Sequence, residues 1–321
     1  MVRMGCIQRL LGKDARWKNS MDFSLIDQEE ITEDRIRELL RNRPRRMRIG
    51  PRGQDWPDVL HEPAKESSQW WVKLPFRETL VNCFNSMCHP GRTYDLSNQT
   101  QPTIYLNDSR DRPDVLDSVR CWIGIVGKYI AIRDALALSF ALDFDRVDGN
   151  PNNQPSEIGQ LREQAKPYGR SLNNDTYNAA DKLVVRCKQF LDEMSCYRDN
   201  IDSLVGMPSR APNPSFSLTN YIASQIAKEF KIDDLTPHVR TRVARKGLKE
   251  VDVRDKLNII RGTIDVDEGE FRGRKVLIIE DLYQAGVSVN YLGMLLQQGG
   301  ARKIFGLACD KTCRNDHNVG A

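Results

Sequence analysis

The chain has 321 residues, 40% of them hydrophobic and 29% charged, and a formal net charge of +4. This composition is typical of a globular protein long enough for two domains. It argues against a membrane protein, because the longest apolar stretch, residues 121–142, is interrupted by Lys128, Arg133 and Asp134. The first residues lack the apolar core of a signal peptide, and the eight cysteines form no C-x-x-C pair, so we expect reduced thiols in a cytoplasmic protein.

Residues 1–70 form a basic segment. Thr32 is placed to cap a short helix, and the chain then gains six arginines and no acid between residues 41 and 52. Guanidinium groups suit phosphates, and nearby tryptophans such as Trp70 stack on bases, so the pattern predicts a nucleic-acid contact. The alternative is a basic tail that is solvated or packs on an acidic protein surface. The arginines of this patch are Arg41, Arg43, Arg45, Arg46, Arg48 and Arg52.

Residues 71–195 are predicted to be mainly helical. Two apolar stripes recur at helical spacing, one behind Pro113 and one before residue 195, and both are typical of core packing. We assign no chemistry to this region and expect it to supply an interface to protein partners. The stripes are Leu116, Val119, Ile123, Val126 and Ile130, and Ala180, Leu183, Val184, Cys187, Leu191 and Met194.

Residues 196–321 show the strand and helix order of a parallel α/β domain. Residues 201–208 are predicted to be a buried strand that ends in a proline turn, and Ser217 is placed to cap the helix that follows. Between this helix and the next strand, residues 238–249 carry basic side chains on both sides of a glycine. Such a segment is either a solvated surface loop or a cationic cover for an anionic ligand.

The most informative segment follows a second buried strand, Val276–Ile279. Glu280 and Asp281 come directly after it, at the carboxyl end where open α/β sheets bind ligands. Gly286 then allows close approach of a ligand to the backbone, and Ser288 is predicted to cap the next helix. The pattern therefore predicts a site for a phosphorylated sugar. The alternative is an ordinary strand-to-helix crossover with a solvated acidic pair.

At these residues the chain resembles the type I phosphoribosyltransferases, whose signature is a hydrophobic strand, two acids and a turn of hydroxyl residues around a glycine. The resemblance implies that Glu280 and Asp281 face the ribose hydroxyls of phosphoribosyl pyrophosphate (PRPP), as catalytic residues, and that the turn binds its 5'-phosphate. Gln284 and Ala285 depart from the signature, because hydroxyl residues are usual at both positions. The implied phosphate-binding residues are Gln284, Ala285, Gly286, Val287 and Ser288.

Upstream, the chain is similar to the ComF-like branch of this family, although it lacks the four-cysteine zinc ribbon with which many ComF proteins begin. The resemblance implies a pyrophosphate loop after the first strand and a mobile loop in the basic segment. The implied pyrophosphate-loop residues are Met207, Pro208, Ser209 and Arg210. The implied mobile-loop residues are Arg240, Arg242, Arg245 and Lys246.

The resemblance implies an α/β protein whose C-terminal domain, residues 196–321, binds PRPP or a nucleotide and transfers or cleaves a phosphoribosyl linkage. Mg²⁺ is expected only as a partner of PRPP, with no metal held by protein side chains alone. Three hypotheses remain open. They are an active phosphoribosyltransferase, a catalytically drifted module that binds nucleotide or nucleic acid, and an assembly partner in a prokaryotic competence or defence complex.

Overall fold

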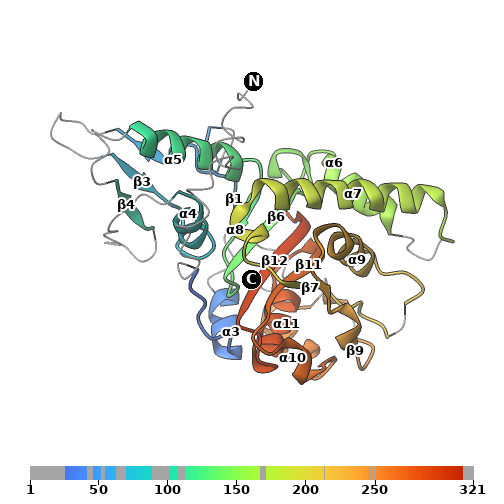
Figure 1. The fold of residues 1–321 in the computed structure, drawn as a ribbon. Coiled ribbons are helices and arrows are strands. Elements are labelled where there is room, and N and C mark those ends of the chain that lie inside the picture. The colour runs from blue at the N-terminus through green and yellow to red at the C-terminus, as the bar shows by residue number, and fades with distance from the viewer. Residues whose placement is uncertain are drawn as a thin grey trace.

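The structure, a computed structural model, describes residues 26–41, 46–51, 55–62, 70–88, 101–106, 113–166, 171–212, 214–245, 247–248 and 251–313. It is a mixed α/β fold built around one mainly parallel sheet (Figure 1), which confirms the predicted fold class. No helix in the described part of the chain is both long enough and apolar enough to cross a lipid bilayer.

The central sheet has seven strands, and its inner strands are almost completely buried. The five strands from β6 to β8 run parallel, whereas β5 is antiparallel to both of its neighbours. All five parallel strands therefore end at one edge. In spatial order the strands are β1 (Arg46–Met47), β5 (Ile130–Ile132), β6 (Leu138–Phe144), β12 (Lys303–Lys311), β11 (Lys275–Tyr283), β7 (Ser203–Gly206) and β8 (Asp233–Asp234).

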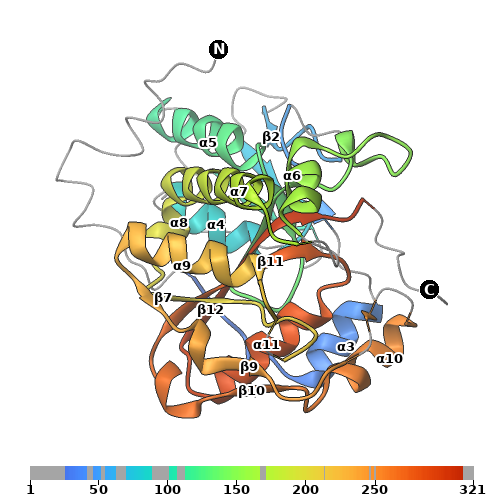
Figure 2. The ribbon, with the colours of Figure 1, turned by 90° about the vertical axis from the view of Figure 1, so that its right-hand side faces the viewer.

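Helices cover both faces of this sheet (Figures 1 and 2). Alternate residues of β11 divide between two hydrophobic clusters, with Leu277 and Ile279 in one and Val276 and Ile278 in the other, as the pleat of a strand buried on both sides requires. One face packs under α6 (Glu157–Ala165), α7 (Asn174–Glu193), α8 (Ser195–Arg198) and α9 (Leu218–Phe230). The other packs under α3 (Glu33–Arg41), α10 (Val253–Ile260) and α11 (Val287–Gln298).

Smaller elements flank this core. A three-stranded antiparallel sheet lies at one side with two helices, and its apolar residues continue the same hydrophobic cluster as α7 and α9. The strands of this sheet are β2 (Leu60–His61), β3 (Trp71–Lys73) and β4 (Thr103–Tyr105), and the two helices are α4 (Leu80–Cys88) and α5 (Pro113–Val126). The remaining elements are the hairpin β9 (Val239–Thr241) with β10 (Ile264–Val266) and the short 3-10 helices η2 (Val147–Gly149), η3 (Thr236–His238) and η5 (Glu268–Phe271).

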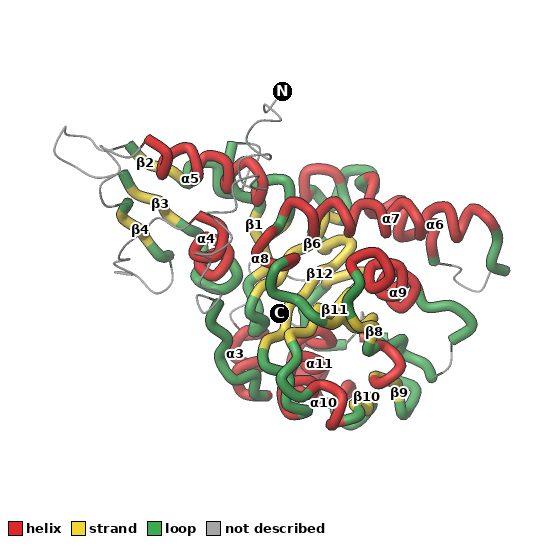
Figure 3. Tube along the Cα trace, in the orientation of Figure 1, coloured by secondary structure: helices red, strands yellow, loops and turns green. Residues whose placement is uncertain are grey.

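The central sheet contains strands from both sides of residue 195, where the sequence suggested a domain boundary. The two apolar stripes do form helices α5 and α7, but the region between them supplies strands β5 and β6 (Figure 3). Ile130 belongs to β5 and not to the preceding helix. The apolar run of β6 lacks alternation because both of its faces are buried, so it resembles a core helix in sequence. β6 pairs directly with β12, and residues 71–195 and 196–313 therefore share one sheet and one core.

Candidate functional site

The turn between β11 and α11 is tightly constrained. Gly286 has φ +78°, and a Cβ atom there would lie 2.0 Å from the hydroxyl oxygen of Tyr283, so no larger residue fits. Tyr283 is buried beneath the turn and donates to Asp134 Oδ2 at 3.0 Å. Asn290 donates to the Gly286 carbonyl at 2.7 Å, and its own Oδ1 accepts from the amide of Ala135 at 2.9 Å. These contacts fix the shape of the turn on the core side.

The start of α11 differs from the prediction by two residues. Gly286 is the N-cap and uses no side-chain hydrogen bond, so Ser288 lies inside the first turn and does not cap the helix. The amides of Val287 and Ser288 donate to no backbone carbonyl of the described residues. Free amides at the positive end of a helix dipole favour an anion at this position.

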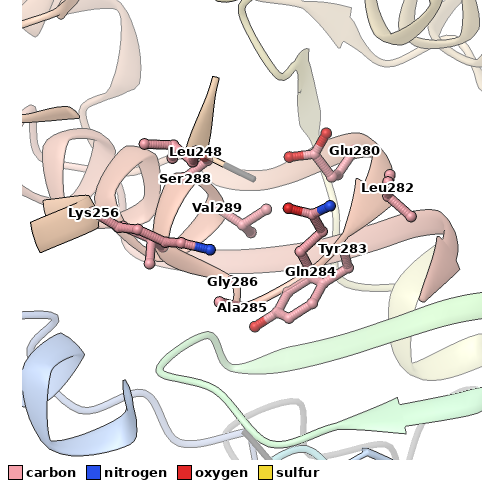
Figure 4. Close-up of a pocket in the computed structure, with 11 residues that line it drawn as sticks. Leu248, Lys256, Glu280, Leu282, Tyr283, Gln284, Ala285, Gly286, Ser288 and Val289 are labelled. Atoms are coloured by element: carbon pink, nitrogen blue, oxygen red, sulfur yellow. The ribbon is translucent and has the colours of Figure 1, made fainter. Parts of the chain in front are cut away.

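A cavity of about 60 Å³ opens at this turn (Figure 4). Lys256, on α10, is only 1% exposed, and its ammonium group points toward the turn. Burial lowers the pKa of Lys256, while the nearby carboxylate of Asp252 opposes that effect. The cavity is lined by Leu248, Lys256, Glu280, Leu282, Tyr283, Gln284, Ala285, Gly286, Val287, Ser288 and Val289.

Sequence reasoning missed Lys256. The residue lies on the same helical face as Ile260, four positions later, and Ile260 is fully buried. A lysine on the apolar face of an amphipathic helix is a departure from the usual pattern, and that departure was the available signal.

The acidic pair at the end of β11 has partners from two distant segments. Asp281 forms an ion pair with Lys166, the residue that ends α6. Burial raises the pKa of Glu280 to about 7, although the positive charges of Lys166 and Arg245 act in the opposite direction. Glu280 lines the cavity together with the turn, whereas Asp281 is not among the lining residues. The structure thus places one carboxyl in the cavity and holds the other with a lysine.

The predicted pyrophosphate loop and mobile loop lie against each other. Met207 is buried and its amide donates to the Ile279 carbonyl at 2.8 Å, so its side chain belongs to the core. The hydroxyl of Thr241 donates to the Ser209 carbonyl, and the Arg245 amide donates to the Arg210 carbonyl at 3.0 Å. The loop of Met207, Pro208, Ser209 and Arg210 is therefore joined to the basic segment by hydrogen bonds to two of its backbone carbonyls.

Of the predicted mobile-loop residues in the described part of the chain, Arg245 is the one whose charge interacts with the acidic pair. Arg240 donates to Asp267 at 3.2 Å, and Arg242 donates to the Gly262 carbonyl at 2.7 Å, so both form contacts at the ends of the β9–β10 hairpin. Burial lowers the pKa of Arg245, the charge of Glu280 opposes that effect, and the buried Nη1 of Arg245 has no hydrogen-bond partner among the described residues. Lys246 lies outside the described residues.

The described members of the arginine patch are engaged within the protein. Arg48 forms an ion pair with Asp143, and Arg46 lies 3.9 Å from Asp55. The guanidinium groups also lie over the ring of Phe144, that of Arg46 at 4.7 Å and that of Arg48 at 5.6 Å from the ring centroid. These two residues fit the alternative of packing on an acidic surface. Nothing is described for the side chain of Arg41, and Arg43, Arg45 and Arg52 lie outside the described residues.

No family model matches the chain, and no curated protein matches it either. Among solved structures, adenine phosphoribosyltransferase from Saccharomyces cerevisiae is similar at 19% identity and a TM-score of 0.29, over 41% of this chain and 69% of that one. A purine phosphoribosyltransferase from Pyrococcus horikoshii is similar at 14% identity and a TM-score of 0.28, over 42% of this chain and 84% of that one. Glutamine PRPP amidotransferase from B. subtilis is similar at 12% identity and a TM-score of 0.31, over 79% of this chain and 64% of that one. These scores are too low to assign a function, which must rest on the residues of the site.

Proposed function

We propose that the carboxyl edge of the sheet binds the phosphorylated ribose of PRPP or of a nucleotide. The observation that carries the proposal is the buried Lys256, whose ammonium group points into the cavity formed by the Gly286 turn. Lys256 brings a positive charge to this cavity, and Val287 and Ser288, at the positive end of the α11 dipole, line the same cavity. A phosphate group satisfies both features.

The size of the cavity suits a phosphate group. About 60 Å³ is enough for roughly four water-sized groups, which matches the oxygens of a phosphate. Leu248 and Glu280 line the same cavity, and the charge of Arg245 acts on Glu280.

The chemistry that such a site supports is transfer of a phosphoribosyl group or cleavage of an N-glycosidic bond. Positive charge develops at the anomeric carbon in such reactions, and a carboxylate beside it stabilises that charge. Burial raises the pKa of Glu280 to about 7, so this carboxyl can also exchange a proton near neutral pH. It lines the cavity beside the turn, which suits either role.

A divalent cation fits the protein side chains poorly. The described residues contain no group of three or more His, Cys, Asp or Glu side chains that could hold a metal ion. Asp281 is already paired with Lys166, and the positive charges of Lys166 and Arg245 both act on Glu280. Mg²⁺ enters this proposal only as an ion that PRPP would bring, and no step of the chemistry above depends on it.

Calorimetric titration with ribose 5-phosphate tests the proposal. We expect Lys256→Met to weaken binding by at least about tenfold, or ~1.4 kcal/mol, because the buried cation is lost. The matched control is Lys228→Met on the exposed surface of α9, which should leave affinity unchanged. Equal affinity in both variants, or no binding by the native protein, contradicts the proposal.

A second candidate is a drifted module that binds a nucleotide, nucleic acid or protein partner without turnover. It is favoured by the Lys166 contact to Asp281 and by Gln284 and Ala285, which remove two hydroxyl donors from the turn. Pyrophosphate release from PRPP separates the two candidates. Binding of ribose 5-phosphate without any release of pyrophosphate, across a panel of nucleobases, supports the drifted module.

A further inference from the structure

The acidic pair receives a positive charge from the N-terminal half of the chain. Lys166 follows α6, which packs against β6 and β12, and its ammonium nitrogen pairs with Asp281 Oδ2. The same charge opposes the rise in pKa that burial causes at Glu280 and at Asp310, which lies near the end of the neighbouring strand β12. One lysine therefore acts on three carboxyl groups at the ends of two parallel strands.

A second positive charge approaches Glu280 from the basic segment. Arg245 is fixed by the hydrogen bond from its amide to the Arg210 carbonyl at 3.0 Å. Its guanidinium group carries a buried Nη1 that has no hydrogen-bond partner among the residues that the structure describes, and it acts electrostatically on Glu280. The two carboxyl groups of the pair are thus balanced by two cationic side chains. A divalent ion placed on this pair would be repelled by both of them.

We infer that Lys166 takes the place of a divalent cation in this site, so that a ribose phosphate binds without Mg²⁺. The inference rests on the proposed function and adds a specific role for a residue outside the α/β half predicted from the sequence. Lys166 neutralises Asp281, so an anionic ligand approaches the strand ends without strong repulsion. Arg245, whose charge also acts on Glu280, adds a second positive charge for an anionic ligand.

The test compares ribose 5-phosphate binding in excess MgCl₂ and in EDTA. We expect the affinity of the native protein to differ by less than about threefold between the two conditions. Lys166→Met should lose at least about tenfold in EDTA and recover most of that loss with MgCl₂, because the freed Asp281 and Glu280 can then hold the ion. Lys188→Met, which removes a lysine paired with Glu229 away from the site, is the matched control and should behave like the native protein.

A second readout uses the metal alone. Mn²⁺ titration followed by electron paramagnetic resonance should show no tight site in the native protein and a new one in Lys166→Met. Circular dichroism of each variant checks that it is folded. Native binding that falls about tenfold or more in EDTA overturns this inference but leaves the proposed function standing. Absence of native binding in both conditions overturns the proposed function, and this inference with it.

Discussion

The turn between β11 and α11 and the acidic pair are adjacent in sequence, yet they are held in different ways. The turn is shaped by a strand end, a glycine with positive φ and a helix start, all within one short segment. The acidic pair follows the same strand, but its charge state depends on Lys166 and Arg245, which belong to other segments. The backbone conformation of the turn is thus determined by residues close in sequence, whereas the charge state of the acidic pair depends on the tertiary structure.

The largest effect is expected at the turn. Gly286→Ala should lower the free energy of unfolding by about 3 kcal/mol, because the residue combines positive φ with a collision against the Tyr283 hydroxyl. Urea denaturation measures this change. Gly269→Ala is the control, since a Cβ at that glycine meets nothing within 4 Å. If both variants unfold at the same urea concentration, the turn is not constrained as described.

Removal of the paired carboxylate should separate binding from folding. Asp281→Ala is expected to weaken ribose 5-phosphate binding by at least about tenfold, because the family resemblance implies that this carboxylate holds ribose hydroxyls, with a shift in melting temperature of only about 2 °C. The small shift is expected because the ion pair with Lys166 is partly exposed. Calorimetry and thermal melting of the same sample provide both values. Unchanged binding and turnover would show that Asp281 is not a site residue.

The acidic pair should also make stability depend on pH. The pKa of Glu280 is raised from 4.5 to about 7, so between these values the folded state binds more protons than the unfolded state. Stability contributed by this group is therefore highest below pH 4.5 and falls as the pH rises to about 7, by about 3 kcal/mol. Glu280→Gln removes this loss, so the variant should gain stability relative to the native protein between pH 5 and pH 8. The exposed Glu270→Gln serves as the control, and parallel pH profiles for all three proteins would contradict the assignment.

The smallest effect is expected in the arginine patch. Arg48→Ala should lower the free energy of unfolding by about 1 kcal/mol, because it removes a partly buried ion pair and a cation–π contact. It should not change salt-dependent retention on single-stranded DNA. A clear loss of retention with unchanged stability would mean that Arg48 contacts nucleic acid instead.

Much of the fold and part of the site could be predicted from the sequence. The β11 strand, the acidic pair and the glycine turn follow from local patterns, because strand, turn and helix start each have a short-range signature. The strand β6 escaped prediction because an apolar run buried on both faces has no periodicity to distinguish it from a helix. Lys166 and Lys256 escaped because only the folded chain brings them to the turn and the acidic pair.

The central claim is that the turn after β11, together with Lys256, binds the phosphate of a ribose phosphate. The most direct test is a ¹H–¹⁵N NMR titration of the protein with ribose 5-phosphate, in which the amides of the turn report on the ligand. We expect saturable shifts at Gly286, Val287 and Ser288 that disappear in Lys256→Met. Shifts confined to other parts of the protein, or no shifts in the native protein, would contradict the claim.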